Sequence, residues 1–161
     1  MLLAACSGAG GDPGADATPS VSASPGRSAA AVSVKVATAE EVKSAVEGRI
    51  SAHEERFGSG ANSPCSTASA EMFTQDCGAA ARATGADASF SLTQIRGREG
   101  FATLRSTAQR IRTAAVAYQH LGCATNPAKA AIRQACQEPA AVLAQGFSDL
   151  RDGANLGLAG K

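Results

Sequence analysis

The chain has 161 residues, a formal net charge of +1, and charged residues at only 18% of its positions. A net charge this close to zero argues against a general nucleic-acid binder, which normally carries a basic excess. No apolar run reaches the roughly 18 residues of a membrane-spanning helix, so the sequence predicts no such helix.

The N-terminus carries the most informative motif, Leu3-Ala4-Ala5-Cys6, which ends a short apolar run and is followed by Ser7-Gly8. Small residues directly before a cysteine in this position resemble the lipobox of bacterial lipoproteins. The resemblance implies that Cys6 carries fatty acyl chains such as palmitate and that residues 1–5 are the remainder of a signal peptide. It also implies a protein tethered to the cell membrane on its extracytoplasmic side, because more than one acyl chain anchors durably.

Residues 6–37 contain the lipidated cysteine and then a stretch rich in Gly, Ala, Ser and Pro. Such a stretch has too little apolar surface to offset the entropy of ordering, so it predicts a flexible linker. The remaining residues, 38–161, are long enough for one domain with a single core.

The first two helices are predicted from capping signals and apolar spacing. A capping box at Thr38 is expected to begin helix one, which Gly58 and Gly60 end. Its apolar face recurs every three or four residues. It consists of Val42, Val46, Ile50, His53 and Phe57. Helix two is expected between Pro64 and about Thr84, with Gly85 ending it.

Helices three and four carry longer apolar stripes. Helix three is the clearest, because its stripe keeps the helical period for five turns before Gly122, a natural C-cap. That stripe consists of Phe101, Leu104, Ala108, Ile111, Ala115, Tyr118 and Leu121. Helix four is expected to begin at Asn126-Pro127, to bend near Cys136–Pro139 and to end at Gly153. Together these elements predict an all-α domain, a disulfide-stapled four-helix bundle behind a disordered N-terminal linker.

Four cysteines remain after Cys6, and an even number in an exported chain predicts disulfides. They are Cys65, Cys77, Cys123 and Cys136. If Cys65 and Cys77 lie on one helix, they are about 18 Å apart, too far to pair. Matching cysteines by their level in the bundle therefore favours Cys65–Cys123 with Cys77–Cys136. Local pairing, Cys65–Cys77 with Cys123–Cys136, is the alternative.

Two sets of charged residues recur every seven positions. Arg98, Arg105 and Arg112 would form a basic stripe that faces an anion, and Glu40, Glu47 and Glu54 an acidic one on helix one. Solvated faces, or interhelical ion pairs of small individual value, are the plainer interpretation.

The sequence shows no motif for nucleophilic catalysis, metal binding or phosphate binding, while its acidic residues leave a carboxylate pair for glycoside chemistry open. It has no GxSxG, SxxK or HExxH, and its two histidines, His53 and His120, lack the short ligand spacing of a metal site. The sequence thus predicts a non-enzymatic binding domain without cofactor or metal, whose partner is an envelope protein or a small ligand. The runner-up is an envelope enzyme, or enzyme accessory, that acts on cell-wall polymers. Oligomeric state stays open.

Overall fold

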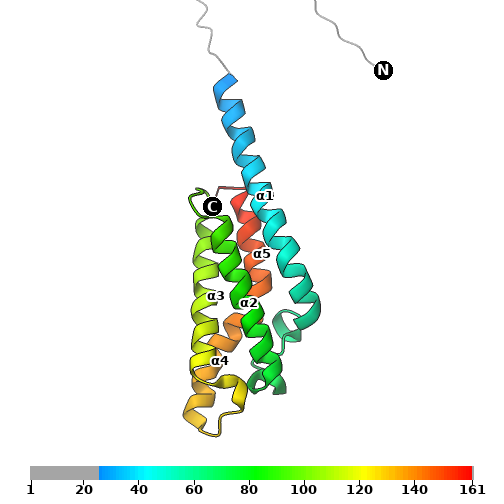
Figure 1. Cartoon of the computed structure of the whole chain (residues 1–161), viewed down its shortest axis with the longest axis vertical. Coiled ribbons are helices and arrows are strands. Elements are labelled where there is room, and N and C mark those ends of the chain that lie inside the picture. The colour runs from blue at the N-terminus through cyan, green and yellow to red at the C-terminus, as the bar shows by residue number, and fades with distance from the viewer. Residues whose placement is uncertain (1–25, 161) are drawn as a thin grey trace, which may run out of the picture.

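The structure, a computed structural model, describes residues 26–160, with side chains from Ala31 onward except that of Ser33. Cys6, the lipobox and the first part of the expected linker lie outside the described residues. Five α-helices and three short 3₁₀ helices make up the described chain, which holds no β-strand (Figure 1). They are α1 (Gly26–Phe57), η1 (Gly60–Asn62), η2 (Ala70–Phe73), α2 (Gln75–Gln94), α3 (Ala102–His120), η3 (Cys123–Thr125), α4 (Ala130–Ala144) and α5 (Gly146–Gly157).

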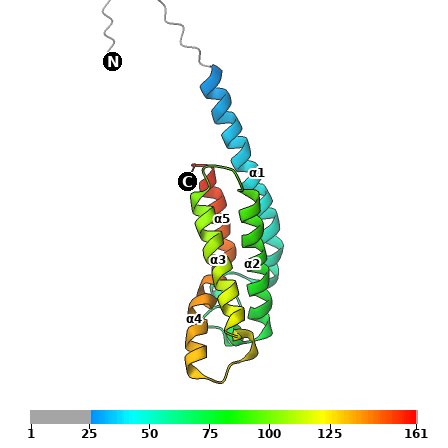
Figure 2. The same ribbon diagram turned by 60° about the vertical axis from the view of Figure 1, so that its left-hand side comes forward.

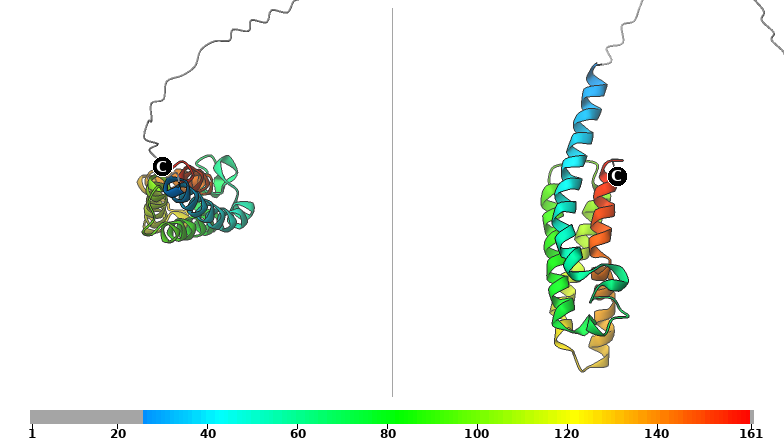
Figure 3. Two further views of the ribbon diagram at one scale, coloured as in Figure 1. Left: turned by 90° about the horizontal axis from the view of Figure 1, so that it is seen from above. Right: turned by 90° about the vertical axis from the view of Figure 1, so that its right-hand side faces the viewer.

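The helices form an elongated bundle with roughly parallel axes (Figure 2). Helix α1 packs on α2 and α5, α2 on α3, and α3 on both α4 and α5. Helices α4 and α5 follow one another along one side of the bundle, while the first turns of α1 project beyond its end (Figure 3). Within the described residues, no helix has both the length and the hydrophobicity that a membrane crossing requires.

The start of α1 corrects the sequence-based boundary. Residues 26–37, assigned above to the linker, form the first turns of α1, which begins at Gly26 rather than at Thr38. No Gly or Pro follows Gly26 until Gly48, and the run is rich in Ala, the strongest helix former, so nothing stops the helix upstream of the capping box. The expected end is confirmed, because Gly58 adopts a left-handed φ of 69° directly after Phe57.

Helix two was placed too early and ended too soon. It begins at Gln75, where the Thr74 side chain accepts a hydrogen bond from the Asp76 amide at 3.2 Å, and it continues to Gln94. Gly85 lies inside the helix instead of ending it. A Cβ at this position would lie 2.9 Å from the Ala115 Cβ, so the glycine permits a close approach of α2 and α3.

The predicted helix four is two helices. Helix α4 begins at Ala130 rather than at Asn126-Pro127 and runs through Pro139. The helix is then interrupted at Gln145, and α5 follows. Gly153 does not end α5 but lies buried in it, where a Cβ would come within 2.9 Å of the Leu104 Cα. The glycine therefore serves helix packing rather than capping.

The core is thin and follows the predicted apolar stripes closely. On α3 the stripe from Phe101 to Tyr118 is buried, as is the stripe of α1 from Val42 to Ile50. Many of the other buried residues are alanines, which let neighbouring helices lie close together but contribute little apolar area each. The bundle therefore gains from cross-links.

Both disulfides join cysteines that are close in sequence, so the preferred pairing is wrong and the local alternative is correct. Cys65 pairs with Cys77, with Cα atoms 4.7 Å apart, and Cys123 pairs with Cys136, at 5.8 Å. The geometric exclusion failed because residues 65–69 are not helical, so the chain loops back before α2 begins. Cys123 likewise lies in η3, and residues 126–129, which are not helical, separate it from α4.

Tyr118 connects α3 to the segment that precedes α2. Its side chain is fully buried, and its hydroxyl donates a hydrogen bond to the Met72 carbonyl. Burial disfavours the phenolate and raises the pKa of Tyr118 to about 12.

Tyr118 is the only tyrosine of the chain, so its ionisation can be followed by ultraviolet absorbance. We expect a midpoint near pH 12 in the native protein, and one near the ordinary value of about 10 in urea. Because the neutral form is favoured in the folded state, the contribution of Tyr118 to the free energy of unfolding should be constant up to about pH 10 and fall above it. A native midpoint equal to that in urea would contradict the buried hydrogen bond.

Candidate functional site

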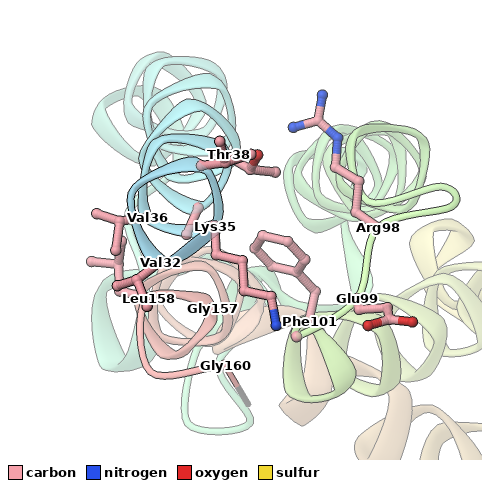
Figure 4. Close-up of a pocket in the computed structure, with 13 residues that line it drawn as sticks. Val32, Lys35, Val36, Thr38, Arg98, Glu99, Phe101, Gly157, Leu158 and Gly160 are labelled. Carbon is pink, nitrogen blue, oxygen red and sulfur yellow. The ribbon is translucent and has the colours of Figure 1, made fainter. Parts of the chain in front are cut away.

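A cleft lies at the end of the bundle from which α1 projects (Figure 4). Its volume is about 610 Å³, within the range of roughly 300–1,000 Å³ that is usual for small-molecule sites. Three parts of the chain form it: the first turns of α1, the loop from α2 to α3, and the C-terminal end of α5. The lining residues are Val32, Val34, Lys35, Val36, Thr38, Ala39, Arg98, Glu99, Gly100, Phe101, Gly157, Leu158 and Gly160.

Apolar side chains form most of the cleft wall. Phe101 is 2% exposed and forms a fixed surface, whereas Val32, Val36 and Leu158 are open to solvent. Close backbone packing holds Phe101 in place, because a Cβ on Gly157 would collide with its ring. A ligand with an apolar part could therefore cover the exposed valines and Leu158 and remove them from water.

The two basic residues of the cleft differ in whether they form an ion pair. Arg98 donates two hydrogen bonds to Glu41, each 3.2 Å long, and these hydrogen bonds and the positive charge lower the pKa of Glu41. Lys35 has no ion-pair partner among the described residues, and its amine reaches across the cleft beside Phe101 (Figure 4). Glu99 lies on the other side of the Phe101 side chain in this view. The amine of Lys35 is thus the cationic group placed to meet a ligand.

A second constellation joins α1 to α2 below the cleft. The Asp87 side chain is completely buried, and it accepts a hydrogen bond from Arg49 Nε at 2.9 Å. Its other oxygen lies 2.7 Å from Nδ1 of His53. In catalytic triads, a buried carboxylate likewise orients the histidine that acts as general base. Here the neighbours of the imidazole ring are apolar, with the Phe57 and Phe147 rings each 6.3 Å away. The contacts of Asp87 join the two helices, and we call them the Asp87 clamp; the side chain of His53 is 33% exposed.

The predicted basic stripe does not form one helical face. Arg98 lies in the loop before α3, and Arg105 donates hydrogen bonds to the Ile95 and Arg98 carbonyls at 3.5 and 3.2 Å. Arg112 is exposed on α3. The loop that ends α2 removes Arg98 from the helix and breaks the seven-residue pattern, so only Arg98 lines the cleft.

The acidic residues of α1 take part in ion pairs. Arg151 of α5 lies 3.6 Å from Glu47 and also pairs with Glu54, and the Glu54 hydrogen bond raises the pKa of Arg151. Glu40 lies 3.9 Å from Lys43. The interhelical pairs therefore bring α1 and α5 together, which is the plainer of the two interpretations.

The two histidines considered for metal binding, His53 and His120, have different surroundings. His53 is engaged with Asp87, and His120 is exposed near the end of α3. Across the described part of the chain, the structure holds no group of three or more His, Cys, Asp or Glu side chains placed to bind a metal ion.

Sequence reasoning missed Asp87, Lys35 and Val36. Asp87 carried no local signal, because its partners lie 34 and 38 positions away. Lys35 and Val36 were assigned to the linker. The absence of any Gly or Pro from residues 27–37 could have revealed them as part of a helix.

Replacing Asp87 with asparagine should lower the free energy of unfolding by about 2–3 kcal/mol, because a buried charged acceptor of two hydrogen bonds is lost. Arg49 and His53 are partly exposed and can regain water, which limits the cost. Urea denaturation measures the effect. The exposed Asp152→Asn is the matched control, expected within about 0.5 kcal/mol of the wild type. Equal effects of the two substitutions would contradict the clamp.

Comparison of the chain with protein-family models, with curated proteins and with solved structures finds no match. We therefore infer the function from the cleft and from the sequence.

Proposed function

We propose that this protein is a cell-envelope lipoprotein, anchored on the extracytoplasmic side of the membrane through acylated Cys6. Its helical domain binds a small amphipathic ligand in the cleft and performs no chemical reaction. In this proposal the domain is a four-helix bundle whose fourth member is divided into α4 and α5. The lipobox and the cysteine usage support the location, because paired disulfides are typical of oxidising, extracytoplasmic environments.

The observation that carries the binding function is the composition of the cleft. Its wall is apolar, formed by Phe101 together with solvent-exposed valines and Leu158, and one amine without an ion-pair partner among the described residues reaches over it. Concave apolar sites with a few placed polar groups are characteristic of small-molecule binding. The chemistry fits a ligand that has an extended apolar chain and an acidic group placed to meet Lys35.

The support for a non-catalytic role also comes from this composition. Among the described residues, the charged groups that line the cleft are Lys35, Arg98 and Glu99, and Arg98 is already paired with Glu41. The buried carboxylate and its histidine lie elsewhere, between α1 and α2. Among the described residues, the cleft lining contains no Ser, Cys or His side chain, and these residue types often serve as nucleophile or base in covalent catalysis.

A fluorescent long-chain fatty acid is a suitable probe, used with the full chain carrying Cys6→Ser so that an anchor lipid cannot occupy the cleft. We expect saturable binding to one site. Val36→Glu should weaken it at least about tenfold, because a carboxylate replaces part of the apolar wall. Lys35→Ala should weaken it about fivefold to tenfold through the loss of one charge-assisted hydrogen bond.

Two controls make the test specific. Val116→Glu changes another exposed valine, on α3 and away from the cleft, and should leave binding unchanged. The methyl ester of the probe should bind wild type and Lys35→Ala equally, since it lacks the acidic group. If Val36→Glu and Val116→Glu bind the fatty acid alike, the cleft is not the site.

A further inference from the structure

We propose that the projecting end of α1 is a docking surface for an anionic lipid membrane. This surface, the α1 tip, comprises residues 31–37. Three of its side chains are large, apolar and exposed: Val32 at 61%, Val34 at 66% and Val36 at 48%. They make up half of the six exposed large apolar side chains in the described chain. The inference goes beyond the proposed function and does not require Cys6 to be acylated.

The three valines are spread around the helix, and this distribution favours a lipid environment that surrounds the helix over a protein partner with a flat surface. Residues two apart on an α-helix point about 200° away from each other. Val32 and Val34 therefore face opposite sides, and one rigid partner surface cannot cover both. The interfacial region of a bilayer surrounds a helix end that enters it, so it can accept apolar side chains on every side.

The charge of this part of α1 fits an anionic membrane. From Gly26 to Ala39 the sequence has two basic residues and no acidic one, whereas five glutamates follow from Glu40 to Glu55. Lys35 has a long aliphatic side chain that can lie along apolar surface while its amine meets a headgroup phosphate. The amino end of a helix also carries a partial positive charge that favours anions. All three features act in the same direction.

A second copy of the chain fits this surface less well. Two α1 tips packed against each other would bring together segments that each hold only positive charge, which is unfavourable without acidic partners. The three valines also offer far less apolar area than a stable protein interface of about 800 Å² per partner needs. The membrane is therefore the occupant that charge and area favour.

The length of the projecting segment sets the depth of contact. Residues 26–37 span about 18 Å of helix at 1.5 Å per residue, short of the roughly 30 Å of a bilayer core. Docking therefore stops at the interface. Because Lys35 and Val36 also line the cleft, this docking places the cleft opening at the headgroup region.

Sedimentation with lipid vesicles tests the proposal, using the full chain with Cys6→Ser so that no acyl anchor contributes. Vesicles of phosphatidylcholine alone are compared with vesicles that contain phosphatidylglycerol as well. We expect binding to the anionic vesicles that weakens with added salt. Val34→Asp and Lys35→Glu should each reduce this binding about tenfold.

Matched controls lie at the other end of the bundle. Val116→Asp replaces a valine that is 59% exposed, and Lys129→Glu reverses an exposed lysine before α4, and neither should change vesicle binding. Circular dichroism of each variant verifies an intact fold. The proposal is overturned if wild type fails to bind anionic vesicles, or if Val34→Asp binds them as Val116→Asp does. A concentration-dependent dimer that Val34→Asp abolishes would identify a second copy as the occupant instead.

The outcome is separable from that of the fatty-acid experiment. Vesicle binding without fatty-acid binding would retain the docking surface and refute the ligand site. Fatty-acid binding without vesicle binding would retain the ligand site and refute the docking surface. Val116 is the control position in both experiments.

Discussion

The buried carboxylate of Asp87 is the interaction on which the arrangement of α1 depends. It binds Arg49 and His53 in the second half of α1, and so fixes this helix against α2. On its other flank α1 meets α5 through Arg151, which pairs with two glutamates. Burying an unpaired carboxylate would be costly, so Asp87 favours the one placement of α1 that satisfies both of its oxygens. The first turns of the helix follow rigidly from that placement and extend past the bundle.

The two ends of the bundle differ in how they are held. At the end distant from the α1 tip, both disulfides close short loops, and the Asn126 amide donates a hydrogen bond to the Phe73 carbonyl at 3.0 Å. Arg133 stacks on the Phe73 ring at 3.7 Å and donates to the Asn126 side chain. Tyr118 adds its buried hydrogen bond to the same region.

At the end with the cleft, the cross-links are fewer and lie nearer the surface. Arg98 and Glu41 join the loop before α3 to α1 across a solvent-exposed gap. Gly100 and Gly160 approach closely and bring the end of the chain beside this loop, because a Cβ on Gly100 would lie 3.3 Å from the Gly160 Cα. The bundle therefore has one cross-linked end and one open, partly apolar end, and the cleft lies at the open end.

The sequence predicted α3 well because its apolar period is unbroken and no competing signal interrupts it. It misplaced the start of α1 because a good capping box at Thr38 lay inside a longer helix-forming run, and a local cap signal does not exclude helix upstream. Sequence alone predicts helix ends at Gly85 and Gly153, whereas contacts with Ala115 and Leu104 on α3 explain both glycines. Interhelical distances of this kind cannot be obtained from spacing along one chain.

The candidate site was less predictable than the fold. The cleft forms only where the α1 tip, the loop before α3 and the end of α5 meet, and these segments are far apart in sequence. Sequence reasoning named Arg98 for its spacing from two other arginines, but the structure pairs it with Glu41 instead. The disulfide pairing failed for a related reason, because the argument assumed helix at residues that form a loop.

If Cys6 is acylated, as we propose, it tethers the chain to a membrane and holds the cleft and the α1 tip beside it. Metabolic labelling of producing cells with an alkyne analogue of palmitate, followed by fractionation, measures this tether most directly. The account predicts label on the wild-type protein in the membrane fraction and none on Cys6→Ser, with both disulfides formed in the wild type. Unlabelled wild-type protein in the cytosol, with its cysteines reduced, would contradict it.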